Sequence, residues 1–224
     1  MVKAVLFDFG GTIAETSGPP RSYEIQRKIL QAHGIKRSLK HIIAADTKVK
    51  KTIDVSQMAD FEDYWVKFDL LLLKELEVHE NTLEVAKAID KEWWNYVDIK
   101  IYPDVLPILH TLRDKSIKLS VISNSLKREL ELMLDMIDLK GFFDLEVGID
   151  TFRQAKPDKE IFLQSVEKLK VSPHEALFVG DSTEIDYEGA KNAGLKALLL
   201  DREHRISSRN VETIHTFNEL LEHL

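Results

Sequence analysis

Short apolar runs alternate with amphipathic stretches over the second half of the chain. Runs rich in Val, Ile, Leu and Phe are typical of strands that are buried on both faces. With one run at the start of the chain, they predict strands over Val2–Phe7, Ile117–Ile122, Leu145–Ile149, Ala176–Val179 and Lys196–Leu200. The helices predicted around and after them cover Asp104–Lys115, Ser125–Leu139, Asp158–Lys170, Ile185–Ala193 and Phe217–Leu224. Such alternation indicates right-handed βαβ units and a parallel sheet with helices on both faces.

Between residues 14 and 100 the pattern is helical throughout. Pro19 and Pro20 are expected to start a first helix that runs to about His33. Two more are expected over Asp60–Glu77 and Asn81–Val97, with Asp60 and Asn81 as N-caps. Helices joined by short loops, with no convincing strand, indicate a small helical bundle.

The two patterns together predict the fold class and the domains. The fold is α/β, with a Rossmann-like parallel-sheet core formed by residues 1–13 and 101–224. The core is interrupted after its first strand by an all-helical domain, residues 14–100.

Composition excludes several classes of function. The 224 residues include no cysteine, so disulfides, thiolate metal sites and cysteine nucleophiles are excluded. The net charge of −7 argues against a general nucleic-acid binder. No secretory signal opens the sequence, and the longest apolar run, Leu70–Leu73, is too short to span a bilayer. We therefore expect a cytoplasmic protein without a membrane partner, either a monomer or a homodimer.

Polar side chains follow the predicted strands. Asp8 ends the first strand, Ser123 follows the second, and Asp181 follows the fourth, with Asp186 five residues further on. Lys156 precedes the third helix of the second half. Because the carboxyl ends of parallel strands lie on one edge of the sheet, these side chains can converge on one pocket.

Such a set of carboxylates, a lysine and a hydroxyl is suited to phosphate chemistry. Carboxylate oxygens at this density are the ligands that Mg2+ prefers. Asp8 could be a metal ligand or a nucleophile that attacks phosphorus to form an aspartyl-phosphate. The alternative is an aspartate that only caps the turn after its strand.

Four motifs occur in order across almost the whole chain: FDFGGT, VISNS, AKPDKEIF and FVGDSTEIDYEGAKNAG. With these motifs the chain resembles the haloacid dehalogenase (HAD) superfamily of hydrolases, in the subgroup whose helical cap is inserted after the first strand. The last motif is the most specific, because its GD-x4-D spacing is followed by GA-x-x-AG. The resemblance implies a HAD-type core, with residues 14–100 as the cap.

The resemblance also implies roles for individual residues. Asp8 would be the nucleophile and a metal ligand, Lys156 would stabilise the nucleophile and the phosphoryl group, and Asp186 would support the metal shell or the lysine. The implied catalytic residues are Asp8, Ser123 and Lys156. The implied substrate-binding residues are Gly11, Thr12, Ser123, Asn124 and Lys156. The implied ligands of Mg2+ are Asp8, Gly10 through its carbonyl, Asp181 and Asp186.

Gly10 departs from the usual phosphatase motif of this family, D-x-D-x-T. The second aspartate of that motif protonates the leaving oxygen, and glycine has no proton to give. General acid–base help, typically about 10²–10⁴-fold, is therefore missing or comes from another group. Family members without this aspartate include 2-haloacid dehalogenases, phosphonoacetaldehyde hydrolases and some phosphatases. A protein that binds a phosphorylated ligand without turnover is a further alternative.

Asp181 favours the phosphatase among these alternatives. A dehalogenase of this family has no use for an acidic metal site, which Asp181 and Asp186 would form. A phosphonoacetaldehyde hydrolase needs a cap lysine for a Schiff base, and the lysine cluster at 48, 50 and 51 reads better as a solvated face. We expect a Mg2+-dependent phosphatase of a small phosphorylated metabolite. The stretch Asp201–Arg205 is expected to be an exposed loop.

Overall fold

The computed structural model of the protein describes residues 1–16, 21–53, 61–206 and 210–224. These residues divide into two compact units. One consists of Met1–Glu15 and Ile99–Leu224, and the other of Thr16–Asp98. The expected N-cap Asp60 and the expected helix start at Pro19 and Pro20 lie outside the described residues.

A six-stranded parallel sheet forms the core of the first unit and confirms the predicted α/β fold class. Its order is β5-β4-β1-β6-β7-β8. The strands are β1 (Ala4–Phe7), β4 (Lys118–Ile122), β5 (Leu145–Val147), β6 (Ala176–Gly180), β7 (Lys196–Leu200) and β8 (Thr213–Ile214). In the central strand Val5 lies opposite Leu119 on one side and Leu177 on the other. All four residues of β1 are fully buried, as its apolar run predicts.

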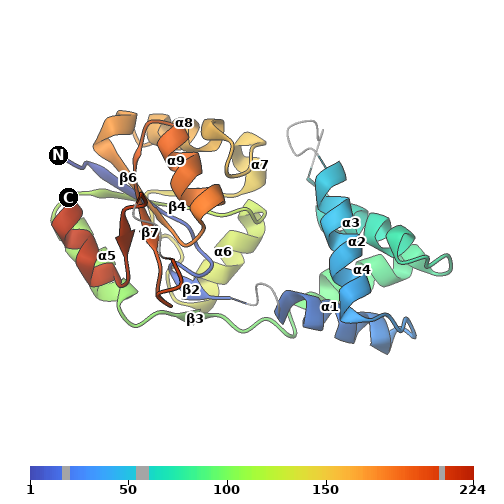
Figure 1. The fold of residues 1–224 in the computed structure, drawn as a ribbon. Helices are drawn as coiled ribbons and strands as arrows, with labels where there is room; N and C mark the ends of the chain where they lie inside the picture. The colour runs from blue at the N-terminus through green and yellow to red at the C-terminus, as the bar shows by residue number, and fades with distance from the viewer. Residues whose placement is uncertain (17–20, 54–60, 207–209) are drawn as a thin grey trace. The chain divides into compact units, whose positions relative to one another are not determined.

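Helices cover both faces of this sheet (Figure 1). They are α5 (Val105–Asp114), α6 (Lys127–Met136), α7 (Ile149–Phe152), α8 (Lys159–Lys168), α9 (Gly189–Asn192) and the 3-10 helices η2 (Pro173–Glu175) and η4 (Phe217–His223). Successive side chains of β1 point to opposite faces of the sheet. Leu6 belongs to the apolar cluster that includes Phe162 of α8, whereas Phe7 stacks on Phe217 of η4 at 5.4 Å.

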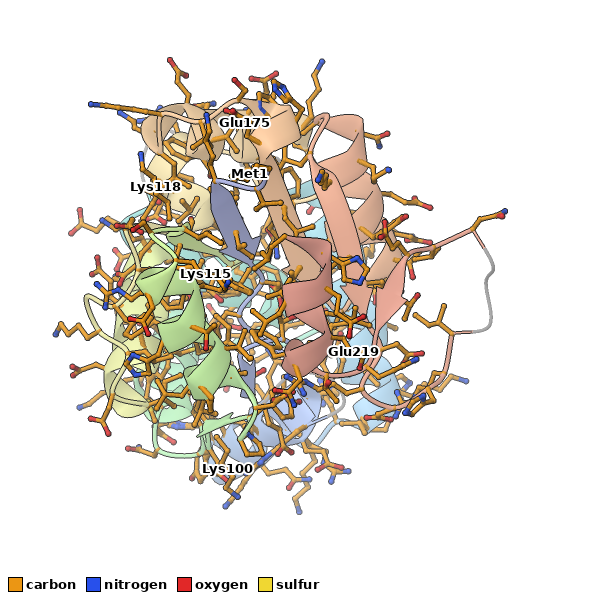
Figure 2. All side chains as sticks on the ribbon, turned by 90° about the vertical axis from the view of Figure 1, so that its left-hand side faces the viewer. Met1, Lys100, Lys115, Lys118, Glu175 and Glu219 are labelled. Atoms are coloured by element: carbon orange, nitrogen blue, oxygen red, sulfur yellow. The ribbon has the colours of Figure 1, made fainter. Side chains whose placement is uncertain are left out.

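The amino ends of the strands form the edge opposite to the polar residues of interest. Figure 2 labels Met1, Lys118 and Glu175 near one another at this edge. Lys3 pairs with Glu175 at 2.5 Å and its carbonyl accepts the Lys118 N–H at 3.0 Å. The carboxyl ends of the same strands are therefore free to carry a site on the opposite edge.

Several elements differ from the expectation. A two-stranded antiparallel ladder joins β2 (Ala14–Glu15) to β3 (Lys100–Ile101), so the expectation of no strand between residues 14 and 100 was wrong at both ends. Pairs this short carry no readable periodicity. The predicted helix over Ile185–Ala193 is instead a π-helical turn, η3 (Thr183–Glu188), followed by α9.

The second unit is helical. Its described helices are α1 (Arg21–Ala32), α2 (Leu39–Thr52), α3 (Tyr64–Glu75) and α4 (Thr82–Trp93). They share an apolar core that contains Ile29, Leu72 and Leu73, all fully buried. Across the described residues of both units, no helix combines the length and the apolar character that crossing a bilayer requires.

A buried carboxyl group lies within this helical core. Asp69 of α3 is 3% exposed and accepts a hydrogen bond from Gln26 Nε2 at 3.4 Å. Burial raises the pKa of Asp69 well above its ordinary value, the nearby Asp90 and Asp46 carboxylates raise it further, and the Gln26 hydrogen bond lowers it. The folded unit therefore favours the neutral form of this acid.

We predict that Asp69→Asn raises the melting temperature of the protein near pH 7. A raised pKa in the folded state means that stability is fully present below the ordinary pKa of about 4 and is lost as the pH rises through the raised value. Asparagine resembles the neutral acid at every pH, so the variant should have a higher melting temperature than the wild type at neutral pH. The increase should be roughly 2–4 °C for each kcal/mol of stability gained, and it should vanish near pH 4.

Thermal unfolding followed by circular dichroism at several pH values measures this difference. Glu84→Gln removes an exposed negative charge from α4 and is the matched control, with no pH-dependent gain expected. An equal gain in both variants would contradict the burial argument.

Candidate active site

Asp8 is held directly at the carboxyl end of the central strand. Its N–H donates to the Val179 carbonyl at 2.9 Å, which continues the hydrogen bonding of β1 with β6. The Asp8 side chain is 13% exposed. The carboxylate is thus positioned by a rigid element and remains open to a small ligand.

The turn after Asp8 is tight. Gly11 donates to the Ala14 carbonyl at 2.8 Å, and Ala14 donates to Phe9 at 3.1 Å, which makes a bridge between Gly10 and Ala14. This bridge does not use the Gly10 carbonyl. Gly11 has a φ of +78°, and a Cβ placed there would overlap the Asp181 carboxylate. Glycine at this position therefore serves both the turn and the close approach of Asp181.

A π-helical turn brings Asp186 back toward the end of β6. The Asp186 carboxylate accepts the Ser182 N–H at 3.1 Å. A Cβ on Gly180 would lie 2.5 Å from the Asp186 Cβ, so the strand can end beside Asp186 only with glycine there. Ligand atoms of Asp8, Asp181 and Asp186 all lie within 4.8 Å of one another. Such π-helical turns are frequent at functional sites.

Lys156 links two of these carboxylates. Its Nζ donates to Asp8 Oδ1 at 2.6 Å and to Asp186 Oδ1 at 2.7 Å. The lysine side chain is only 2% exposed. A buried ammonium with two charge-assisted hydrogen bonds fixes both the position and the orientation of the Asp8 carboxylate.

The three carboxylates are in excess over this one ammonium. Burial raises the pKa of Asp8 to about 7; Asp186 and Asp181 also raise it, while Lys156 lowers it. Loss of hydration raises the pKa of Asp181 to about 6, with a further contribution from Asp186. Burial alone would lower the pKa of Lys156, but Asp8 and Asp186 hold it above its ordinary value. The site therefore favours uptake of positive charge, and its oxygen donors fit a hard divalent cation.

Ser123 and Asn124 follow β4 at the same edge of the sheet. Ser123 is buried, and its Oγ accepts the Ser125 N–H at 3.2 Å. The Asn124 side chain is paired with the main chain of Lys156: Nδ2 donates to the Lys156 carbonyl at 2.9 Å, and Oδ1 accepts the Lys156 N–H at 2.8 Å. Asn124 therefore anchors the loop that carries the lysine, and one Nδ2 hydrogen is left for a ligand.

The structure brings four of the predicted residues into direct proximity, namely Asp8, Lys156, Asp181 and Asp186. Thr12 is different because it is fully buried and its hydroxyl has no hydrogen-bond partner among the described residues. The Thr12 side chain therefore does not face solvent.

The stretch expected to be an exposed loop after the last predicted strand is partly buried. Asp201 is 6% exposed and accepts N–H groups from Arg205 and Ile206. The side chain of Arg202 is 17% exposed and reaches the Thr12 carbonyl at 3.1 Å. The expectation was wrong for these two residues: Asp201 accepts main-chain N–H groups of its own loop, and Arg202 has a partner 190 residues away in the sequence.

The acidic cluster and the buried lysine lie at the carboxyl edge of an open α/β sheet, which is where enzymes of this architecture bind their ligands. A family model described as haloacid dehalogenase-like hydrolase matches residues 2–194. The chain belongs to this family of hydrolases.

Several curated relatives carry phosphatase names. Over 100 residues the chain is 43% identical to the phosphoglycolate phosphatase of Aquifex aeolicus. This match covers 45% of this chain and 46% of that protein. Over 202 residues the chain is 28% identical to the glyceraldehyde 3-phosphate phosphatase of Methanopyrus kandleri. This match covers 90% of this chain and 85% of that protein.

Solved structures agree with the fold. An HAD phosphatase from Thermococcus onnurineus is 27% identical, with a TM-score of 0.70 and coverage of 99% of this chain and 97% of that one. A 2-haloacid dehalogenase from Pseudomonas syringae has a TM-score of 0.76 at 21% identity, with the same coverage, and is similar in fold.

We predict that Gly11→Ala disables the site and that Gly34→Ala does not. Both glycines have a φ near +80° (+78° and +79°), but only the Cβ at Gly11 would meet the Asp181 carboxylate, because nothing lies within 4 Å of the one at Gly34. Each variant should lose roughly 1–2 kcal/mol of stability from backbone strain. Only Gly11→Ala should also lose activity, by about 10²-fold, because it displaces a carboxylate of the site.

Thermal unfolding and hydrolysis of p-nitrophenyl phosphate compare the two variants. Equal activity in both would show that the contact between Gly11 and Asp181 does not matter to the reaction.

Proposed function

We propose that the protein is a Mg2+-dependent phosphatase that hydrolyses a small phosphorylated metabolite through an aspartyl-phosphate on Asp8. The observation that supports this most is the gathering of Asp8, Asp181 and Asp186 around a single lysine. A carboxylate nucleophile that attacks carbon, as in a dehalogenase, needs no such excess of acids. The phosphatase names of the relatives favour the same conclusion.

The proposed metal ligands are Asp8, Asp181, Asp186 and the carbonyl of Gly10. When bound there, Mg2+ would offset the negative charge of the carboxylates and of a phosphate ester, so that an anionic nucleophile can approach phosphorus.

The first proposed step is attack by Asp8. Because Lys156 holds Oδ1, we assign the attack to Oδ2, which forms a bond to phosphorus while the bond from phosphorus to the ester oxygen breaks. The Lys156 ammonium lies beside the charge that develops on the phosphoryl oxygens, and Ser123 would donate to one of them. The oxygen of a water molecule then bonds to phosphorus while the bond from phosphorus to Asp8 Oδ2 breaks, and inorganic phosphate leaves with the protons of that water, which restores the Asp8 carboxylate.

A Schiff-base mechanism receives no support from Lys48 or Lys50. Lys48 pairs with Glu75 at 2.5 Å and Lys50 pairs with Asp46 at 2.8 Å, and both lysines are exposed. A Schiff-base lysine needs a depressed pKa and a neutral amine. In the proposed enzyme the helical unit, residues 16–98, serves as the cap that selects the leaving group.

Hydrolysis of p-nitrophenyl phosphate tests the proposal. We expect phosphate release that requires Mg2+, is lost with a chelator, and falls about 10³-fold or more in Asp8→Asn. Asp114→Asn removes an exposed carboxylate at the end of α5 and is the matched control, with full activity expected. Metal-independent chloride release from 2-chloropropionate would instead identify a dehalogenase.

Metal binding has its own measurement. Mg2+ should raise the melting temperature of the wild-type protein, since a ligand that binds only the folded state stabilises it. Asp181→Asn should abolish this shift and keep the fold. A shift of the same size in Asp181→Asn would contradict the assigned ligands.

Gly10, which stands where the phosphatase motif has its second aspartate, yields a separate prediction. Gly10 cannot protonate a leaving group, so the wild-type protein should hydrolyse p-nitrophenyl phosphate well and alkyl phosphates poorly. Gly10→Asp should raise the rate for alkyl phosphates by about 10²-fold and change the p-nitrophenyl rate little, because a good leaving group needs no acid. Gly10 is not among the residues of positive φ, so a side chain brings no left-handed strain.

Rates for a series of phosphate esters with different leaving-group pKa values measure this effect. Gly10→Asn has nearly the same shape without the acidic proton and is the control. A gain for alkyl phosphates in Gly10→Asn as well would show that the effect is steric.

A further inference from the structure

Arg202 reaches from the loop after β7 to the turn that follows Asp8. Its Nη2 donates to the Thr12 carbonyl at 3.1 Å, and its Nη1 donates to Asp104 Oδ2 at 2.9 Å. Thr12 and Arg202 are separated by 190 residues. One guanidinium therefore ties the Asp8 turn to the residue that precedes α5.

The guanidinium is fixed by its surroundings. Its Cζ lies 4.0 Å from the centre of the Tyr102 ring and 5.4 Å from that of Phe217. The same Asp104 oxygen accepts the Phe217 N–H at 2.9 Å. Burial alone would raise the pKa of Asp104, but the hydrogen bonds from Arg202 and Phe217 keep it below its ordinary value. The lowered pKa favours the ionised form of Asp104, and the pair is flanked by the Tyr102 and Phe217 rings.

The rest of the turn is held by main-chain bonds. Ile13 and Ala14 both donate to the Phe9 carbonyl, at 2.9 and 3.1 Å, and these bonds set its local shape. The Tyr102 N–H donates to the Ile13 carbonyl at 3.1 Å, and Ala14 pairs with Ile101, so the end of the turn is joined to β3 and the residue after it. Arg202 adds a charged side-chain donor from outside the turn, one residue before Ile13.

We propose that Arg202 is a positioning residue for the reaction: held by Asp104 and by the Tyr102 and Phe217 rings, it fixes the Thr12 carbonyl and with it the turn that carries Asp8. This inference rests on the proposed phosphatase function, because it makes the guanidinium act on the nucleophile through the main chain. A partly buried ion pair adds little net stability compared with apolar side chains of similar size. Its directional hydrogen bonds instead set geometry.

Hydrogen–deuterium exchange tests the positioning without any assumption about the reaction. In Arg202→Met the peptides that cover residues 9–14 should exchange about tenfold faster, since a hydrogen bond from a charged donor is lost. Peptides from β4, α8 and the helical unit should be unchanged. Arg205→Met removes a guanidinium from the same loop, but its side chain is 75% exposed and pairs with Glu203, so no change is expected.

Kinetics with p-nitrophenyl phosphate and Mg2+ provide a second test of the positioning role of Arg202. Arg202→Met should lower kcat about tenfold with KM unchanged, because the substitution loosens the turn after Asp8 but removes no contact with the substrate. Arg202→Lys keeps a charge near Asp104 but loses the fork that reaches two acceptors, so it should recover only part of kcat. If Arg202→Met does not fold, the double variant Arg202→Met/Asp104→Asn avoids the unpaired carboxylate and takes its place.

The outcomes separate the two proposals. An inactive wild-type protein overturns the phosphatase function, and the exchange of residues 9–14 still decides whether Arg202 fixes the turn. Unchanged exchange in the Arg202 variants overturns the positioning role, as does faster exchange with an unchanged kcat in an active enzyme. Faster exchange of residues 9–14, with β4, α8 and the helical unit unchanged, together with a lower kcat supports it.

Discussion

The site depends on one buried ammonium shared between two carboxylates. Lys156 reaches Asp8 and Asp186 from a loop that belongs to neither of their elements. With 2% of its side chain exposed, the lysine cannot exchange these partners for water. Breaking a buried pair of this kind leaves an uncompensated charge and typically costs about 3–5 kcal/mol. Lys156 thus links the β1 end and the η3 turn to its own loop, which Asn124 anchors through the main chain.

Much of this arrangement follows from the sequence, because strand ends are readable from apolar runs. Asp8 and Asp181 come directly after such runs, and a parallel sheet brings the ends of neighbouring strands together. The position of Asp186 is less readable. It depends on a π-helical turn, and the sequence signal there is an ordinary helical one. No sequence pattern predicts the contact of Asn124 with the main chain of Lys156.

The Arg202 contacts show the limit of pattern reading. Periodicity reports which face of an element is buried, but Arg202 lies in a loop with charged neighbours and looks solvated. Its partner Asp104 is 98 residues away, and the Thr12 acceptor is a main-chain carbonyl that any residue could supply. Contacts between loops at long sequence separation are therefore found only when the fold is known. The short β2–β3 ladder was missed for a similar reason, since two residues are too few to alternate.

The charge of the site bears on which substrates suit it. Three carboxylates and one ammonium leave an excess of negative charge, and a divalent cation would offset it before a phosphate arrives. In the proposed enzyme a phosphate ester would restore this excess, and the leaving oxygen would depart from surroundings that do not favour a further negative charge. An aspartic acid at position 10 would relieve this by donating a proton, but glycine stands there. The leaving group would then carry the charge that the site does not neutralise, so the proposal makes the acidity of the leaving group the main constraint on the substrate.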